Sequence, residues 1–316
     1  KICKKKSKQF KSKGLRKQSD LIKNRGRYLL LLPAIVFIVV FAYLPMVGML
    51  IAFENYDPVQ GIFGSEWVWF DNFKFFFSGS KWIEVTVNTL YLNVMFIITG
   101  TIAALAIAIL LSELTNKIYV KLSQTFMTLP NFVSWASVAL FSVAFLSTDG
   151  IINKVLTGIG ADQIEFSTDP SVWRATFIII RVWKTAGWSS IIYMAAIAGI
   201  SPDIYEAAKI DGANRFQCIF RVTLPLLKEV VILQLLFSIG SVFRGDFGMI
   251  YPFIGDNSLL YPTTDVIDTY VYRAVRTQSD FSKTMAVGIY QSVLGLVMVL
   301  VANGLTRRYA PEASLF

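Results

Sequence analysis

Long apolar runs separated by shorter polar segments dominate the chain. A helix that crosses the hydrocarbon core of a bilayer needs about 20 apolar residues. Six runs reach that length: 28–53, 85–111, 119–146, 173–200, 227–249 and 284–305. The first run carries no charge, although it contains Pro33 and Pro45, which membrane helices tolerate. The pattern predicts an all-α polytopic membrane protein with six transmembrane helices, which form one domain over residues 28–316 after a tail over residues 1–27.

Composition excludes several other classes of protein. Of the 316 residues, 54% are hydrophobic and 16% are charged, whereas a soluble domain carries about 25% charged residues. A soluble enzyme and a disordered chain are therefore both excluded. The chain has no His and only two Cys, which are far apart. It thus lacks the commonest general base and the ligands of a zinc cluster, and we predict neither a catalytic site nor a metal site.

The net charge of +9 is concentrated at the N-terminus. Residues 1–27 contain 12 Lys or Arg and a single acid, Asp20, whereas the remaining residues carry 18 bases and 20 acids. A polybasic segment directly before an apolar span is typical of a cytoplasmic anchor that faces anionic lipid. We therefore predict membrane lipid as a partner of this tail and no nucleic acid. The charged region is also too long for a signal peptide.

The distribution of Lys and Arg predicts the orientation. If the N-terminus is cytoplasmic, the inner segments hold 20 Lys or Arg and the outer loops hold six. This is the positive-inside bias of bacterial membrane proteins, so both termini are expected in the cytoplasm. Cys3 and Cys218 would then face a reducing compartment, and no disulfide is expected.

The outer loops are predicted at about 54–84, 147–172 and 250–283. The first of them is rich in aromatic residues: Trp67, Trp69, Phe70, Phe73, Phe75, Phe76 and Phe77. Such residues favour the membrane–water interface. A short amphipathic helix on the outer surface is the first interpretation, and a docking surface for an external protein is the alternative.

A cytoplasmic loop over residues 201–226 separates the fourth and fifth spans. Its residues predict a first helix over about 203–211, followed by Gly212, which permits a tight turn at the helix end. A second helical stretch over about 214–221 then leads to Pro225, where the fifth span is expected to begin. Taken by itself, this arrangement fits either a docking element or a plain connecting loop.

The loop resembles the EAA loop of ABC-importer permeases. The matching residues are Glu206-Ala207-Ala208, Gly212 and Leu224-Pro225, and Asp211-Gly212-Ala213 fits the sub-pattern of sugar permeases. Val222 stands where the family pattern has Ile. Further likeness lies in Trp183-Lys184-x-x-Gly187-Trp188, Asp246-Phe247-Gly248 and Tyr261-Pro262-Thr263-Thr264-Asp265. From Tyr28 onward the chain is similar to lipo-oligosaccharide and aldouronate-type permeases of Gram-positive bacteria, which implies a type I ABC importer permease fold.

This resemblance implies that the loop couples the chain to a separate ATPase. The residues implied in coupling are Glu206, Ala207, Ala208, Asp211, Gly212, Ala213, Leu224 and Pro225. Glu206 would pair with a basic group of the ATPase, the two alanines would allow close approach, Gly212 would supply the bend, and Pro225 would fix the start of the fifth span. The chain has no G-x-x-x-x-G-K-[ST] motif. ATP and Mg would therefore be bound by the partner ATPase dimer, and the chain would be no enzyme.

The resemblance implies two other partners and a location. A second, related permease would form a heterodimer with this chain, and an extracytoplasmic sugar-binding lipoprotein would deliver the substrate. The complex would lie in the cell membrane of a bacterium, on this resemblance a Gram-positive one.

Charged residues inside spans predict the pathway, because each costs about 2.5–3.5 kcal/mol at the bilayer centre and calls for a reason. In the fourth span one helical stripe collects Trp173, Phe177, Arg181, Lys184 and Trp188. The fifth span adds polar residues and its outer end adds charges: Gln234, Ser238, Ser241, Arg244 and Asp246.

Aromatic rings beside hydrogen-bonding groups suit a sugar. The cations could hold the carboxylate of an acidic oligosaccharide. In the alternative interpretation, Arg181, Lys184 or Arg244 pairs with Asp246 or with lipid phosphate and contacts no substrate.

The sequence thus predicts the permease subunit of an ATP-driven importer for an oligosaccharide. The rival is a secondary transporter or channel that works alone. Such a protein is expected to show inverted repeats with broken helices or carboxylates buried in mid-span. The six runs contain no Asp or Glu at the membrane centre.

Overall fold

The computed structural model describes residues 24–309, and this part of the chain is mostly helical. Most of the predicted basic tail, and Cys3 with it, lies outside the described residues. Five segments are long and apolar enough to cross a membrane: Arg25–Phe53, Lys81–Ser112, Trp135–Gly158, Arg215–Ile239 and Phe281–Arg308. Helix α8 (Trp173–Ala198) is as long, but it carries Arg174, Arg181 and Lys184. The predicted count of six spans therefore stays a prediction.

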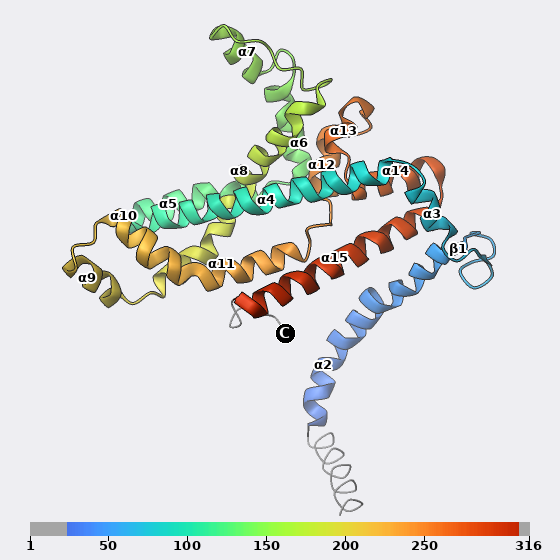
Figure 1. The fold of residues 1–316 in the computed structure, drawn as a ribbon, viewed down its shortest axis with the longest axis horizontal. Coiled ribbons are helices and arrows are strands. Elements are labelled where there is room, and N and C mark those ends of the chain that lie inside the picture. Colours follow the sequence, from blue (N-terminus) through green and yellow to red (C-terminus); the bar gives the residue numbers. More distant parts are fainter. Residues whose placement is uncertain (1–23, 310–316) are drawn as a thin grey trace, which may run out of the picture.

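The first apolar run forms one continuous helical rod of three parts. These are α2 (Arg25–Ile38), the π-helical η1 (Val39–Tyr43) and the 3-10 helix η2 (Leu44–Phe53). Pro45 has no N–H and cannot donate to the preceding turn, and the widened turn lies directly before it. No described side chain of α2 is buried, and α2 projects away from the other helices (Figure 1).

A small hairpin and a short helix follow this rod. Strand β1 (Glu54–Asn55) pairs antiparallel with β2 (Glu66–Trp67), and α3 (Asp71–Phe77) is the short helix predicted in the aromatic segment. The side-chain amide of Asn72 donates to the carbonyls of Ala52 and Glu54, at 2.9 Å each. A single buried amide thereby fixes α3 to the end of the rod.

The centre of the bundle is the pair formed by α4 (Lys81–Ser112) and α8, which pack along each other. The small residues Ala104 and Ala108 of α4 lie against Tyr193 of α8 and allow the two backbones to approach. Toward the other end of the pair, a larger apolar core joins Phe177 of α8 to Phe96 of α4.

The prediction that the third span is a single helix is wrong. Residues 119–146 are divided into α5 (Lys117–Thr128), the 3-10 turn η3 (Leu129–Phe132) and α6 (Trp135–Leu146). Pro130 interrupts the hydrogen-bond ladder. Ser134 then starts a new helix, because its hydroxyl oxygen accepts from the N–H of Ser137 at 3.1 Å. Helix α7 (Ile151–Gly158) and the turn η4 (Pro170–Val172) lead from α6 to α8.

The bounds predicted for the fifth span, 227–249, are wrong, because the helix begins earlier and ends earlier than predicted. After α9 (Pro202–Ile210), one continuous helix comprises α10 (Arg215–Cys218), the π-helical η5 (Ile219–Thr223) and α11 (Leu224–Ile239). Pro225 therefore lies inside a helix rather than at its start, and the π-helical turn before it relieves the clash that its ring would cause. The helix ends at Ile239 instead of 249.

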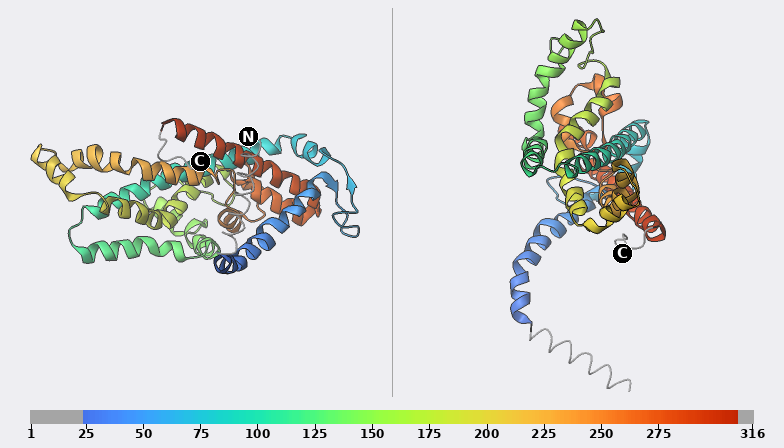
Figure 2. Two further views of the ribbon diagram at one scale, coloured as in Figure 1. Left: turned by 90° about the horizontal axis from the view of Figure 1, so that it is seen from below. Right: turned by 90° about the vertical axis from the view of Figure 1, so that its left-hand side faces the viewer.

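The C-terminal elements are shorter helices followed by one long helix. They are α12 (Phe247–Ile254), η6 (Ser258–Leu260), α13 (Tyr261–Thr264), α14 (Ile267–Gln278) and α15 (Phe281–Tyr309). Helices α9 and α10 lie at one end of the long axis of the molecule, and the hairpin, α3 and α14 lie at the other end (Figures 1 and 2).

Candidate functional site: the coupling segment and the polar cavity

The coupling segment, residues 201–226, takes its shape from local signals. Pro202 begins α9, where a missing N–H costs nothing. The helix ends at Ile210, and Gly212 in the turn after it has a φ of +83°. The N–H of Gly212 donates to the carbonyl of Lys209 at 3.0 Å, and the N–H of Ala213 donates to that of Ala208 at 2.9 Å. These two bonds form a Schellman cap, which favours glycine at the left-handed position.

The second helix of the coupling segment begins with a capping box. The side chain of Asn214 accepts from the N–H of Gln217 at 2.9 Å, and that of Gln217 accepts from the N–H of Asn214 at 2.8 Å. The Tyr205 hydroxyl lies 3.0 Å from Oγ1 of Thr223 and joins α9 to the π-helical turn η5. The two helices are thus connected by a side-chain contact as well as by the turn.

The predicted coupling residues lie together on this segment and are accessible. Glu206, Ala207, Asp211, Gly212 and Pro225 are exposed, and Ala208, Ala213 and Leu224 are half-buried. Leu224 and Pro225 begin α11, beyond α10 and η5. Three apolar side chains missed by the sequence analysis, Ile210, Phe216 and Phe220, are 87%, 74% and 65% exposed. The signal available in the sequence was the position of these apolar residues among polar ones in and after the predicted turn. The segment therefore has an exposed surface of apolar side chains among charged residues of both signs.

A polar cavity of about 310 Å³ lies between α4, α8 and α11. It brings together five of the predicted pathway residues: Arg181, Trp188, Gln234, Ser238 and Ser241. It also contains hydrogen-bonding side chains that the stripe on the fourth span did not include: Asn93, Thr101, Asn131, Thr185, Ser189 and Tyr193. The half-exposed ring of Trp188 adds an aromatic face, so the cavity offers what a sugar requires.

The two cations of the stripe are already engaged by the protein. Arg181 forms an ion pair with Asp246, and its guanidinium lies over the ring of Phe96, 4.9 Å from the centroid. The Lys184 ammonium, on a residue that is 6% exposed, donates to the carbonyls of Pro130 and Asn131 at 3.2 and 2.9 Å. Lys184 is thereby a tie between α8 and η3, and it does not line the polar cavity.

Three other predicted pathway residues are not part of the cavity lining: Phe177, Arg244 and Asp246, the last of which reaches the cavity only through its ion pair with Arg181. Phe177 is fully buried and packs against Trp173 and Phe253, with ring centroids 5.1 and 5.8 Å away. The half of the stripe with Trp173 and Phe177 is therefore core, because Phe253 of α12 covers that part of α8. The side chain of Arg244 is exposed and is not part of the lining.

The break in the fifth span is a non-helical connector, residues 240–246, held by side chains from four helices. Asn93 of α4 donates to the carbonyl of Arg244 at 3.1 Å, and Gln291 of α15 donates to that of Phe243 at 2.7 Å. Asp268 of α14 accepts from the N–H of Gly245 at 2.6 Å. The fourth contact is the ion pair from Arg181 of α8 to Asp246. Non-helical backbone within a membrane protein requires such partners.

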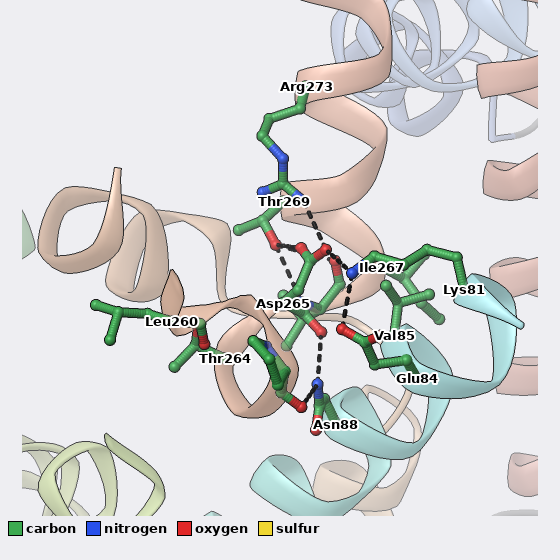
Figure 3. Close-up of polar contacts among 12 residues, drawn as sticks. Lys81, Glu84, Val85, Asn88, Leu260, Thr264, Asp265, Ile267, Thr269 and Arg273 are labelled. Atoms are coloured by element: carbon green, nitrogen blue, oxygen red, sulfur yellow. Dashed lines mark hydrogen bonds and ion pairs between the residues drawn. The ribbon is translucent and has the colours of Figure 1, made fainter. Parts of the chain in front are cut away.

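A buried carboxylate organises the other end of the molecule (Figure 3). The Asp265 side chain is fully buried, and its Oδ2 accepts from Arg273 at 2.6 Å and lies 3.3 Å from the Lys81 ammonium. Asn88 of α4 donates to the Asp265 carbonyl at 3.2 Å. Asp265 belongs to the motif Tyr261-Pro262-Thr263-Thr264-Asp265, so that motif positions α13 and α14 on the start of α4.

Comparison with known proteins agrees with this architecture. Residues 96–311 match the family described as binding-protein-dependent transport system inner membrane component. The Protein LplB of Bacillus subtilis is 36% identical over 95% of this chain and 94% of its own length. The polygalacturonan/rhamnogalacturonan transport system permease protein YteP of the same organism is 35% identical over 96% of this chain and 94% of its own.

A solved structure shows the same fold. A chain of a bacterial ABC transporter involved in the import of the acidic polysaccharide alginate superposes with a TM-score of 0.85 at 35% identity, covering 93% of this chain and 99% of that one. The fold predicted from the EAA loop is therefore confirmed. By its sequence and its fold, the chain belongs to the family of binding-protein-dependent transport system inner membrane components.

Proposed function

We propose that this chain is the permease subunit of an ATP-driven importer that moves an oligosaccharide into the cytoplasm. The observation that carries the proposal is the position of the coupling segment. It follows α8 directly and continues without a break into α11, and these two helices line the polar cavity. A push on α9 would therefore reach two walls of the cavity together.

The exposed coupling segment is the contact with an ATPase dimer, which would bind ATP and Mg. Glu206 would meet a basic group of that subunit, and Ala207 and Ala208 would permit close approach of the backbone. The bend at Gly212 would hold α9 at an angle to the helix that begins at Arg215. Transport by this chain alone, as a secondary transporter or channel, is the alternative.

The lining of the polar cavity suits the sugar units of an oligosaccharide, because amides and hydroxyls lie beside aromatic rings. The printed names of relatives agree with this substrate class, since YteP belongs to a polygalacturonan/rhamnogalacturonan transport system and the solved chain belongs to an alginate importer. A related structure contains the alginate transporter with a pentasaccharide-bound periplasmic protein. We accordingly propose that an extracytoplasmic sugar-binding lipoprotein delivers the substrate.

A second, related permease is proposed as the heterodimeric partner, in a bacterial cell membrane with both termini inside. The rod Arg25–Phe53 supports a partner or lipid contact, because its most apolar part has no buried residue. The Bacillus relatives favour a Gram-positive membrane.

The test uses the assembled complex in lipid vesicles, with the binding protein loaded by neutral or by uronate-bearing oligosaccharides. Sugar-stimulated ATP hydrolysis and sugar uptake are measured together. In Glu206→Arg the stimulation is expected to fall at least tenfold, because a like charge would face the basic group of the ATPase. The matched control is Glu165→Arg, which makes the same charge change at an exposed residue between α7 and η4, outside the coupling segment.

Normal stimulation in Glu206→Arg would show that the coupling assignment is wrong. Uptake of sugar without any ATP would favour the secondary transporter or channel. If neither sugar stimulates ATP hydrolysis in the wild type, the substrate class is wrong.

A further inference from the structure

We propose that Asp246 sets the charge preference of the polar cavity. By pairing with Arg181, Asp246 neutralises the charge on the α8 wall of the cavity. This wall therefore binds the hydroxyl-bearing faces of sugar residues rather than their carboxylates. The inference rests on the proposed oligosaccharide import. It concerns only which group of the substrate this chain contacts.

The charges at the cavity are few and balanced. Among the described residues that line it, Arg181 is the one charged side chain. Its partner Asp246 lies at the end of the connector, and the two side chains are 28% and 27% exposed. Lys184, the next cation along α8, is occupied by two carbonyls and does not line the cavity. A substrate carboxylate would therefore meet no free cation on this wall.

Asp246 is held in place independently of Arg181. Its Oδ1 accepts from the N–H of Met249 at 3.1 Å and caps α12, while Oδ2 forms the ion pair. Arg181 is positioned in turn by the ring of Phe96 and by the sulfur of Met249, 3.8 Å from Nη1. Both partners are thus fixed before substrate enters.

A substrate carboxylate would have to displace the Asp246 carboxylate from Arg181 and leave it without its cation. Removing one member of a partly buried ion pair is strongly unfavourable, because the remaining charge loses its compensation. Hydroxyl groups face no such cost, since they can add to the free lone pairs and N–H groups of the pair and to the side chains of Asn93, Gln234 and Ser238. The cavity wall consequently favours neutral, hydroxyl-bearing faces.

The experiment measures uptake of a neutral and a uronate-bearing oligosaccharide of equal length by the full complex in vesicles, for the wild type and three variants. The reported quantity is the ratio of acidic to neutral uptake, so that losses of assembly cancel. Asp246→Asn keeps the cap on α12 but frees Arg181, and the ratio is expected to rise about tenfold because a charge-assisted contact becomes available. Arg181→Gln leaves Asp246 unpaired and is expected to lower the ratio by about as much.

The double variant R181Q/D246N is the decisive control, because it removes both charges and restores a neutral wall. Its ratio is expected to stay within about twofold of the wild type, as mutual compensation requires. If the double variant loses acidic uptake while neutral uptake persists, Arg181 holds the substrate carboxylate and the proposal is overturned. An unchanged ratio in Asp246→Asn overturns it as well.

If Asp246→Asn does not assemble, Asp246→Ser retains a cap acceptor on α12 and must shift the ratio in the same direction. If the wild type takes up neither sugar, the proposed function fails. Uptake of both sugars with equal ratios in all variants would refute only the role of Asp246.

Discussion

Two interruptions of the helical path between α8 and α15 are built in opposite ways. The coupling segment is exposed, and its turn and both caps are closed by hydrogen bonds between residues at most five apart. The connector 240–246 is instead held by side chains from α4, α8, α14 and α15. The first can move as a preformed unit, whereas the second keeps its shape only while the surrounding helices stay in place. Substitutions should therefore destabilise the bundle around the connector and leave the fold intact at the coupling segment.

The largest loss of stability is expected from Gly187→Ala in α8. A Cβ at this position would lie 1.9 Å from the carbonyl oxygen of Met127, so α5 would have to move away. We expect a cost of about 3 kcal/mol or more in the free energy of unfolding. Gly288→Ala in α15 is the matched control, because no atom lies within 4 Å of its added Cβ. Thermal unfolding of both variants in detergent measures the difference, and equal midpoints would refute the close approach of α5 and α8.

The next effect concerns the connector directly. Asp268→Ala removes the acceptor of the Gly245 N–H and of the Gln291 amide, at 2.6 and 2.7 Å. The loss of both bonds is expected to cost about 2 kcal/mol, because the Gly245 N–H loses its acceptor and the Gln291 amide keeps only its bond to the Phe243 carbonyl. Asp256→Ala, which breaks the exposed pair with Arg276, should cost less than about 1 kcal/mol. Similar unfolding midpoints for the two variants would mean that the connector does not depend on α14.

A smaller effect should appear as a pH dependence. Burial raises the pKa of Asp268 above its ordinary value of 3.8, against the opposing effect of its hydrogen bonds. The raised pKa means that the folded state binds the proton more tightly. This tighter proton binding contributes to the free energy of unfolding. The contribution is complete below pH 3.8 and is lost as the pH rises through the pKa of the folded state. Asp268→Asn keeps an acceptor without the charge, so its stability should vary less across that pH range. Identical pH profiles of the unfolding midpoint for the two proteins would contradict this account.

The sequence predicted the coupling segment better than the pathway, and the reason is physical. The bend at Gly212 and the two helices around it follow from residues close in sequence. The breaks at η3 and at the connector depend on tertiary partners, such as Asn93 and Gln291, that no apolar run reveals. The stripe of the fourth span brings Arg181 and Trp188 to the polar cavity, but Phe177 is core because α12 packs on that face of α8. The family and its fold could be predicted because the EAA motif is itself local.

A small change in stability and a large change in sugar-stimulated ATP hydrolysis are expected for Gly212→Ala. Gly212 has a φ of +83° and Gly160, after α7, has a φ of +79°, and neither has an atom within 4 Å of an added Cβ. Alanine should cost each site about 1 kcal/mol of backbone strain, because an L-residue disfavours this conformation. The unfolding midpoints of Gly212→Ala and Gly160→Ala should therefore be alike. Only Gly212→Ala should lower sugar-stimulated ATP hydrolysis, since it alters the angle at which α9 meets an ATPase. Equal stimulation in both variants would show that the bend is merely a way to turn the chain, whereas a loss confined to Gly212→Ala would make its geometry part of the coupling.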